Sequence, residues 1–382
     1  MAIVCQLSPV AVNYGKTAFQ TKDRSVKKNN NLPAEENSGP LMADVARLAG
    51  VAISTVSRAL ANPGRVNEKT RAKIAAAAEE LSYTPNATAR SLRVGKSNIV
   101  MIILPGSLHY GASQIIPQVL QSINQTLIQN GYNLMIANLD RDETSEQHIL
   151  NLAFGGTVRG AIILSSKLPE VGGRSLAEAG LPIVSLLLDM SGVSLPSVVT
   201  NDRGAVMEAA RALIELGHQR FLYIAGPGDN YHDIERFGGL VDAFHEAGLD
   251  PASIVRSGGV LSYQHGFKTG KQAVEDFARL AVKPTAVIAA SDDMAISFLS
   301  GVQAMGWRIP EDLSVIAFDG SPVCEYCHPP LSTIEQPVEE MGKAAVTTLM
   351  QRIDNAQNQM PMRQVIPSRL VRRESIRAPL HR

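Results

Sequence analysis

Near the carboxyl-terminal end, two thiols and an imidazole have a spacing that could support metal, haem or redox chemistry. Cys324, Cys327 and His328 form Cys-x-x-Cys-His, a pattern typical of covalent haem attachment, and the cysteine spacing also suits a thiol pair. Haem attachment of this kind requires export, and the first residues lack the basic segment of a secretion signal. A zinc site would need a second ligand pair, which Cys5 alone does not supply. We therefore expect a loop without metal or cofactor here; a redox or metal role is the alternative.

A second group of polar side chains lies within the stretch DVARLAGVAISTVSRAL. Its apolar spacing predicts a short helix, a tight turn at Gly50 and a second helix, which is a helix-turn-helix pattern. In such a motif the first residues of the second helix contact base edges in the DNA major groove. Here those residues are Ile53, Ser54 and Thr55, with Arg58 one turn further on. Considered singly, the hydroxyls could equally cap a helix and the arginine could be a solvated charge.

Three helices must position these side chains. The third is predicted from about Glu68 to Leu81, with Asn67 as its cap. Together the three helices would close a small core. The apolar positions expected to form it are Val45, Leu48 and Ala49, then Val56, Ala59 and Leu60, and finally Ile74, Ala77, Ala78 and Leu81.

Charge is distributed unevenly along the 382 residues. The chain has 36 basic and 36 acidic residues, so its formal net charge is zero. Residues 41–96, however, carry nine basic and four acidic groups, whereas residues 97–382 carry 22 basic and 29 acidic groups. A basic amino-terminal segment on an acidic body favours a nucleic-acid partner for that segment.

Residues 1–40 differ in composition from the rest of the chain. TKDRSVKKNNNLPAEENSGP is polar, rich in asparagine and interrupted by proline and glycine, which is typical of an unstructured leader. Translation that starts nearer Met42 is the alternative. No apolar run reaches the length of a membrane span, and three cysteines suit a reducing compartment, so we expect a cytoplasmic protein with no membrane partner.

From Ser97 onward, short β-branched apolar runs alternate with helix-length amphipathic segments. This alternation predicts an α/β body with parallel sheets covered on both faces. There are too many strands for one ordinary sheet, and residues 194–201 are interpreted as a crossover. We therefore predict two doubly wound lobes with a ligand cleft at the carboxyl ends of the strands. The predicted strands are 99–104, 133–137, 161–164, 183–187, 220–224, 286–289 and 314–318, and the predicted helices are 114–129, 142–154, 203–216, 234–247, 265–278, 292–305 and 338–353.

The motifs of several enzyme classes are missing from the sequence. Neither GxGxxG nor GxxxxGK[ST] occurs, and no nucleophile-base spacing stands out. We therefore do not expect an enzyme.

Longer motifs carry a resemblance to a known family. VARLAGVAISTVSRAL, VNEKTRAKI and YTPNATARSL together resemble the DNA-binding headpiece of the LacI/GalR family of bacterial transcription regulators. LIELGHQRFLYIAGP, ERFGGLVDAF, PTAVIAASDDMAI, PEDLSVIAFDG and PPLSTIEQP resemble the effector domain of the same family, which shares the fold of periplasmic sugar-binding proteins. The resemblance covers roughly residues 41–375, and ANPGRV and TIEQP resemble the CytR-like branch, which responds to a nucleoside.

For the DNA side, the resemblance implies that Ile53, Ser54 and Arg58 read the major groove of an operator. The resemblance also implies a hinge helix that would begin at Asn86 and end at Leu92. Within it, Ala89 and Leu92 would lie at the minor groove, and Leu92 would act as an apolar wedge between base steps. An ordinary core leucine is the alternative. We also assign Thr55 and Arg71 to the DNA-binding surface.

Two departures from the family pattern concern hydroxyl groups. The family commonly opens the first helix with a Thr-Ile-Lys-like triplet and has serine after Gly-Val, whereas this chain has Leu41-Met42-Ala43 and Ala52. Both changes remove groups that could cap a helix or contact phosphate, so we expect weaker anchoring to the DNA backbone.

For the effector side, the resemblance places a hydroxyl-binding arginine at Arg236 and a carboxylate at Asp319. Paired hydrogen bonds from such groups suit vicinal hydroxyls. Ser291 and Asp319 could instead cap a helix and a turn. Where relatives often have a stacking aromatic residue, this chain has Leu261. Further candidates are Ser291, Asp189, Ser107 and His109.

These features predict a homodimeric repressor that binds double-stranded operator DNA. Its operator affinity would be controlled by a small sugar or nucleoside bound between the lobes, with a coupling on the order of 1 to 3 kcal/mol. The alternatives are a solute-binding protein of a transport system and a regulator controlled by a partner protein. We expect a headpiece at 41–96 with a hinge helix at 86–92, and an effector and dimerisation domain at 97–382. Its first lobe would comprise about 98–200 and 336–366, and its second about 201–335 and 367–375.

Overall fold

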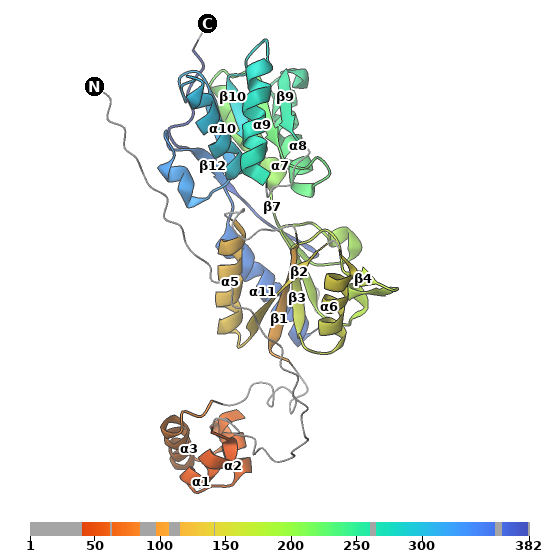
Figure 1. Ribbon diagram of the computed structural model, residues 1–382, viewed down its shortest axis with the longest axis vertical. Helices are drawn as coiled ribbons and strands as arrows, with labels where there is room; N and C mark the ends of the chain where they lie inside the picture. The colour runs from red at the N-terminus through yellow and green to blue at the C-terminus, as the bar shows by residue number, and fades with distance from the viewer. Residues whose placement is uncertain are drawn as a thin grey trace, which may run out of the picture. The chain divides into compact units, whose positions relative to one another are not determined.

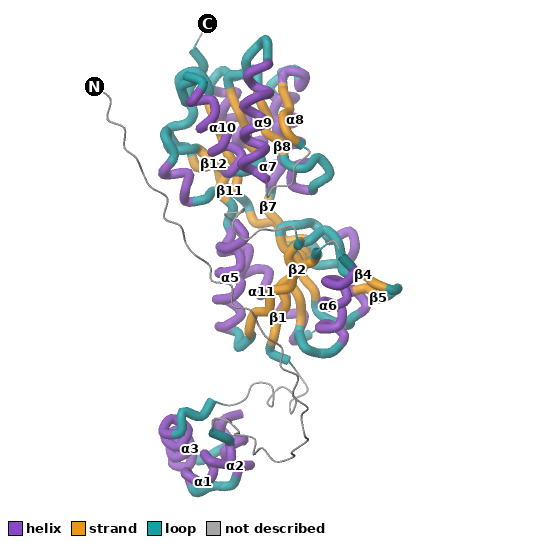
Figure 2. Tube along the Cα trace, viewed as in Figure 1, coloured by secondary structure: helices purple, strands orange, loops and turns teal. Residues whose placement is uncertain are grey.

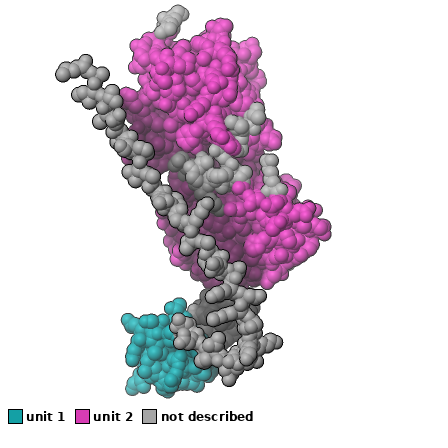
Figure 3. Space-filling model, viewed as in Figure 1, with its two compact units in different colours: residues 1–86 teal, residues 87–382 magenta. Residues whose placement is uncertain are grey.

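The computed structural model describes residues 40–61, 63–84, 97–106, 115–140, 142–259, 265–355 and 361–380. The chain divides into two compact units, residues 1–86 and residues 87–382, which Figure 3 colours separately. None of the helices in the described ranges is long and apolar enough to cross a membrane.

The amino-terminal unit is a three-helix cluster. Helix α1 (Met42–Ala49) ends at Gly50, whose φ of 65° is left-handed and lets the chain turn directly into α2 (Ile53–Ala61). After the 3-10 turn η1 (Pro63–Arg65), helix α3 (Glu68–Glu80) begins with the side chain of Asn67 accepting a hydrogen bond from the Lys69 amide, which confirms the predicted cap.

The core of this unit corrects one prediction. Leu48 is 46% exposed, and the buried residue of α1 beside Val45 is instead Ala46. Helix α1 has only eight residues, so the spacing of its apolar residues does not determine which side of the helix faces α2 and α3. Small Ala46 suits this close approach. The buried residues of this cluster are Val45, Ala46, Val56, Ala59, Ile74 and Ala77, and Ala49, Leu60, Ala78 and Leu81 pack against them.

The larger unit contains two six-stranded sheets. The first has the strand order β13-β7-β6-β3-β1-β2, with all neighbours parallel. Its strands are β1 (Ile99–Pro105), β2 (Asn133–Leu139), β3 (Gly160–Ile163), β6 (Ile183–Leu186), β7 (Ser197–Thr200) and β13 (Arg363–Ile366).

Strand β1 shows why helices cover both faces of this sheet. Alternate side chains point to opposite faces, so the run VMIIL is buried on both. Val100, Ile102 and Leu104 belong to the core beneath α5 (Ile115–Gln129) and α11 (Val338–Asp354). Met101 and Ile103 belong to the core beneath α6 (Glu143–Phe154). Figure 1 shows α5 and α11 on one side of the sheet and α6 on the other.

The second sheet has the strand order β14-β12-β11-β10-β8-β9. Helix α7 packs against α8 and α9 against α10, and Figure 2 shows these helices surrounding the strands. The strands are β8 (Phe221–Ala225), β9 (Ile254–Gly258), β10 (Ala286–Ala289), β11 (Ser314–Asp319), β12 (Ser332–Glu335) and β14 (Arg369–Val371), and the helices are α7 (Asp202–Glu215), α8 (Tyr231–Glu246), α9 (Gly266–Arg279) and α10 (Asp292–Ala304).

Two predictions about strands need correction. The predicted crossover at 194–201 contains strand β7, because the short run Ser197–Thr200 is fully buried between β6 and β13. The second sheet is not purely parallel, since its edge strand β14 is antiparallel to β12. The α/β architecture with two doubly wound lobes is confirmed, as is the all-helical amino-terminal unit.

The chain passes between the two sheets three times, from β7 to α7, from β12 to α11 and from β13 to β14. Two of these crossings are joined by a hydrogen bond, since the Ser368 amide donates to Asn201 Oδ1 at 2.8 Å. Smaller elements are the hairpin β4 (Glu170–Val171) and β5 (Arg174–Ser175), and the 3-10 turns η2 (Leu176–Glu178), η3 (Ser191–Val193), η4 (Pro251–Ser253) and η6 (Pro322–Tyr326). Turn η6 occupies the predicted loop around Cys324 and Cys327.

Candidate DNA-binding and effector sites

The start of α2 presents the predicted base-reading side chains on its solvent side. Val56 and Ala59 point into the core of the unit, which leaves Ile53, Ser54 and Arg58 exposed. Ile53 is 51% exposed. Thr55 is half-buried and Arg71 on α3 is exposed.

An acidic side chain satisfies one backbone donor at the start of α1. The Asp44 carboxylate accepts a hydrogen bond from the Leu41 amide at 2.9 Å and also pairs with Arg47. One of the unpaired donors at this helix end is therefore satisfied without a serine or threonine cap. Among the predicted site residues, Asn86, Ala89, Leu92, Ser107 and His109 lie outside the described residues.

Arg236 lies at the centre of the candidate effector site. Its side chain is 5% exposed on α8. Nε donates to Asp202 Oδ2 at 3.0 Å and Nη1 donates to the Ala290 carbonyl at 2.5 Å, while the guanidinium lies 3.6 Å from the ring centre of Phe318. Elements α7, β10 and β11 thus hold the planar group in one orientation. Such fixed donors are suited to paired hydrogen bonds with a ligand.

Asp202 balances this charge in a buried network. It accepts hydrogen bonds from Arg236, from His232 Nδ1 at 2.9 Å and from the Thr200 hydroxyl. Burial by itself would raise the pKa of Asp202, but the charge of Arg236 and the bonds from His232 and Thr200 hold it well below its usual value. Asp202 therefore stays ionised over the physiological range.

Asp319 ends β11 in a strained conformation. Its φ of 131° is rare for a residue with a side chain, and such geometry clusters at ligand sites. It accepts a hydrogen bond from Gln336 Nε2 at 2.9 Å. Burial raises the pKa of Asp319 well above its usual value, and Asp292 adds to the rise, although Arg236 acts in the opposite direction. The structure therefore brings Arg236 and Asp319 into the same electrostatic environment.

Three consecutive polar residues at the start of α10 have different roles. Ser291 caps the helix by accepting a hydrogen bond from the Met294 amide at 3.4 Å, which is the alternative role given for it above. Asp292 accepts hydrogen bonds from the Ser321 amide and hydroxyl and from the Thr333 hydroxyl at 2.6 to 2.7 Å, so it links α10 to the turn after β11 and to β12.

Asp293 follows on the same turn and behaves differently. It is buried, and among the described residues Oδ1 has no hydrogen-bond partner. Burial and the neighbouring Asp292 raise the pKa of Asp293 to about 6.

Asp189, the candidate on the first sheet, is already engaged by the protein's own groups. Its Oδ1 accepts from the Ser191 amide at 3.0 Å and from the Ser191 hydroxyl at 2.6 Å. Its Oδ2 accepts from Arg363 Nε at 2.6 Å. The carboxylate of Asp189 is therefore held in place by Ser191 and Arg363.

The remaining candidates follow the ends of parallel strands in the second sheet, as the fold requires. Ser291 follows β10, Asp319 ends β11 and Gln336 follows β12. The sequence reasoning missed Gln336, Asp202, His232 and Phe318. The position of Gln336 directly after a short β-branched run was an available signal, whereas Asp202 could only be found from its partners.

The Cys-x-x-Cys-His segment has surroundings that disfavour thiolate chemistry. Burial raises the pKa of Cys324, and Asp292 adds to the rise. Burial also raises the pKa of Cys327. Since the thiolate is the metal ligand and the nucleophile, both sulfurs are poorly suited to either role. In the described part of the chain, no group of three or more His, Cys, Asp or Glu residues is arranged to hold a metal ion.

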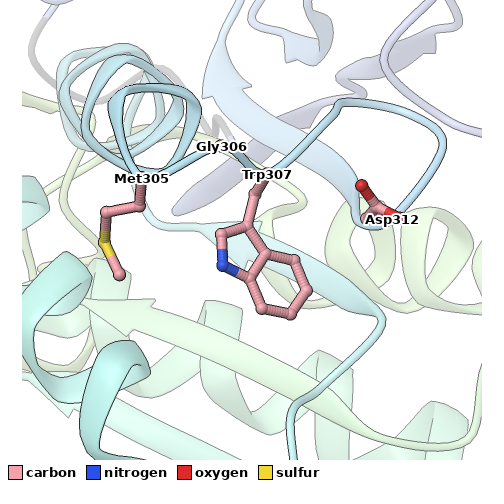
Figure 4. A pocket seen from close by; sticks show the side chains of 4 residues that line it. All are labelled: Met305, Gly306, Trp307 and Asp312. Atoms are coloured by element: carbon pink, nitrogen blue, oxygen red, sulfur yellow. The ribbon is translucent and has the colours of Figure 1, made fainter.

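One small surface pocket lies at the opposite end of α10. It has a volume of about 190 Å³ and is lined by Met305, Gly306, Trp307 and Asp312, as Figure 4 shows. Helix α10 runs from Asp292 to Ala304, so its two ends are about 18 Å apart. The pocket is therefore distinct from the candidate effector residues.

Comparison with known proteins matches both parts of the chain to known families. Residues 41–86 match the family described as bacterial regulatory proteins, lacI family, and residues 210–376 match the periplasmic binding protein-like domain. The chain is 32% identical to the HTH-type transcriptional repressor CytR of Escherichia coli K12, over 84% of this chain and 91% of the relative. It is also 32% identical to the ribose operon repressor of Haemophilus influenzae, over 88% and 98%.

Solved structures give the same result. The lac repressor dimer bound to operator and the anti-inducer ONPF superimposes with a TM-score of 0.73 at 25% identity, over 89% of this chain and all of that chain. The complex of the transcriptional regulator CelR with cellobiose has a TM-score of 0.63 at 28% identity, over 88% and 99%. These similarities show that the chain belongs to the LacI family of bacterial regulatory proteins and is a DNA-binding transcriptional regulator, not an enzyme.

Proposed function

We propose that this protein is a cytoplasmic homodimeric repressor whose affinity for its operator is set by a small polyhydroxylated ligand, a sugar or a nucleoside. The observation that carries the ligand class is the arrangement around Arg236. A buried guanidinium is fixed by Asp202, the Ala290 carbonyl and the Phe318 ring, with Asp319 nearby. An arginine and a carboxylate together supply donors and acceptors for vicinal hydroxyls, which is the recognition that sugars and ribose rings share.

The relatives support the same class of ligand. One relative is a ribose operon repressor, and a solved neighbour at 28% identity was obtained with cellobiose. In the proposed site Arg236, Asp319 and Ser291 contact the ligand, and Asp189, held by Ser191 and Arg363, is a candidate from the first lobe. Ser107 and His109, which would lie after β1, remain candidates from the first lobe.

On the DNA side, we propose that Ile53, Ser54, Thr55 and Arg58 read the major groove and that Arg71 contributes to the same surface. Residues 86–92 would form the hinge, with Asn86 at its start and Ala89 and Leu92 at the minor groove. The proposed units are a headpiece at 41–96 and an effector domain at 97–382, in which the chain crosses between the two lobes three times.

Calorimetry against a panel of sugars and nucleosides tests the ligand class. We expect one compound of the panel to bind the full-length protein, and we expect binding to be lost in Asp319→Asn and retained in the control Asp242→Asn. If no compound of the panel gives a heat of binding, the proposal is contradicted. Selection of genomic fragments with the purified protein, with and without the binding compound, then gives the operator and the direction of regulation.

A further inference from the structure

The three crossings between the lobes of the larger unit are very short. In the first, Asn201 alone lies between β7 and α7; in the second, Gln336 and Pro337 lie between β12 and α11; in the third, Pro367 and Ser368 lie between β13 and β14. Proline fixes its own φ at about −65°, so two of the crossings have little torsional freedom. Movements of one domain against another are absorbed by a few residues of this kind between rigid elements. The arrangement of the lobes therefore depends on the conformation of these residues.

The first crossing is attached to the effector site on both sides of Asn201. Asp202 follows it and accepts hydrogen bonds from Arg236 Nε at 3.0 Å and from His232 Nδ1 at 2.9 Å. Thr200 precedes it and donates its hydroxyl to the same carboxylate. A change in the backbone at Asn201 therefore moves the group that holds the arginine.

The second crossing is attached to the same site through Gln336. Its amide donates to the Asp319 carbonyl at 3.2 Å, and its Nε2 donates to Asp319 Oδ1 at 2.9 Å. The ring of Phe318, the residue before Asp319, has its centre 3.6 Å from the guanidinium of Arg236. Hydrogen bonds, one peptide bond and this ring contact therefore link Gln336 to Asp202.

The third crossing reaches this network through the side chain of Asn201. The Ser368 amide donates to Asn201 Oδ1 at 2.8 Å, and Ser368 is only 7% exposed. Asn201 occupies the N-cap position of α7, where an asparagine side chain commonly accepts a hydrogen bond from the first turn of its own helix. Here it makes no such bond to the helix. The residue type suits a helix cap, but the contact that it makes joins two crossings.

We propose that Asn201 is a positioning residue that joins the third crossing to the effector site, so that the three crossings open and close as one cooperative unit. A ligand held by Arg236 and Asp319 then acts on every connection between the lobes at once. This last step rests on the proposed function, whereas the cooperative behaviour of the crossings does not.

Hydrogen exchange in the full-length protein, without effector or DNA, tests this unit. The amides to follow are those of Ser368 in the third crossing and Gln336 in the second, since both donate hydrogen bonds. Mass spectrometry of separate proteolytic peptides distinguishes them. Amides that exchange through one cooperative opening are accelerated together when a bond within the unit is removed.

Asn201→Ala removes the acceptor of the Ser368 amide. We expect exchange to become about fivefold faster at Ser368 and at Gln336 alike, because one net hydrogen bond is lost from the unit. Asn201→Asp keeps an oxygen acceptor and should restore exchange at both amides. The matched control is Asn151→Ala, because Asn151 is exposed and accepts a hydrogen bond from Gln147 Nε2 within α6. It should change neither amide.

Faster exchange at Ser368 with Gln336 unchanged would indicate a purely local bond and overturn the cooperative unit. Unchanged exchange at both amides, or an equal rise in Asn151→Ala, would also overturn it. Should Asn201→Ala fail to fold, Asn201→Ser decides in its place, because serine is favoured at a helix N-cap but its shorter side chain lacks Oδ1. Absence of binding by every sugar and nucleoside would refute the proposed ligand class while leaving this measurement intact.

Discussion

Replacing Arg236 by methionine removes a buried charge while keeping most of the side-chain volume. The partner Asp202 is 1% exposed and would be left ionised with His232 and Thr200 as its remaining hydrogen-bond donors. Removing one partner of a buried ion pair typically costs about 3 to 5 kcal/mol. Because His232 and Thr200 still solvate the carboxylate, we expect a value near the lower end, about 3 kcal/mol.

Arg236→Lys separates charge from geometry. Lysine keeps the positive charge beside Asp202 but cannot also reach the Ala290 carbonyl with a planar fork. The loss of one buried hydrogen bond should cost about 1 to 2 kcal/mol. The matched control is Arg203→Met, because Arg203 forms a comparable pair with Asp242 that is 48% and 33% exposed, and exposed pairs contribute about 0 to 1 kcal/mol.

The chain contains a natural reporter for this comparison. Trp307 is the single tryptophan of the sequence, and its ring lies edge-on to that of Phe277 in the same lobe, with the ring centres 4.9 Å apart. Urea unfolding followed by its fluorescence should give midpoints in the order wild type, Arg203→Met, Arg236→Lys, Arg236→Met. With a slope of about 1 to 3 kcal/mol/M, the last should fall by about 1 M or more. Equal midpoints for Arg236→Met and Arg203→Met would refute the reasoning.

Three further outcomes are expected. Burial lowers the pKa of His218, which forms hydrogen bonds with Thr285 and Ser314. The stability that His218 contributes should therefore be present above about pH 6.5 and lost as pH falls. His218→Gln should reduce the dependence of the urea midpoint on pH in this range, and an unchanged dependence would contradict this. Burial and Asp292 raise the pKa of Asp293 to about 6, so the stability that Asp293 contributes should be lost as pH rises through 6. Asp293→Asn should therefore have a higher melting temperature than wild type at pH 7.5 but not at pH 4.5, measured in a thermal-shift assay. Leu92→Ala should weaken operator binding by a few kcal/mol and leave binding to random DNA nearly unchanged in filter assays, and equal losses would rule out the wedge.

The parts of the fold that were predictable have a strong local signal. The apolar run of β1 and the capped helix α3 follow directly from residue type and period, whatever their neighbours. Strands β13 and β14 were missed because RQVI and RLV are short, partly charged edge strands that exist only because β7 and β12 pair with them. Such strands are decided by long-range contact and leave almost no pattern in the sequence.

The same division holds for the effector site. Arg236 and Asp319 were identified from a family motif, and the structure places them in one electrostatic environment. The actual surroundings of Asp189 could not be foreseen, because its partner Arg363 lies 174 positions away in the chain. Residue type at a strand end therefore indicates a polar site, but only the folded packing shows which polar groups are already satisfied.

The route of the backbone between the sheets has a consequence for synthesis on the ribosome. Each lobe receives an edge strand from the last part of the chain, β13 at Arg363–Ile366 and β14 at Arg369–Val371. The helical amino-terminal unit has no such requirement, so it can complete its core while hundreds of residues are still to be made. A premature stop before codon 363 would remove an edge strand from both lobes at once. The product would be a DNA-binding unit attached to an effector domain that cannot finish folding.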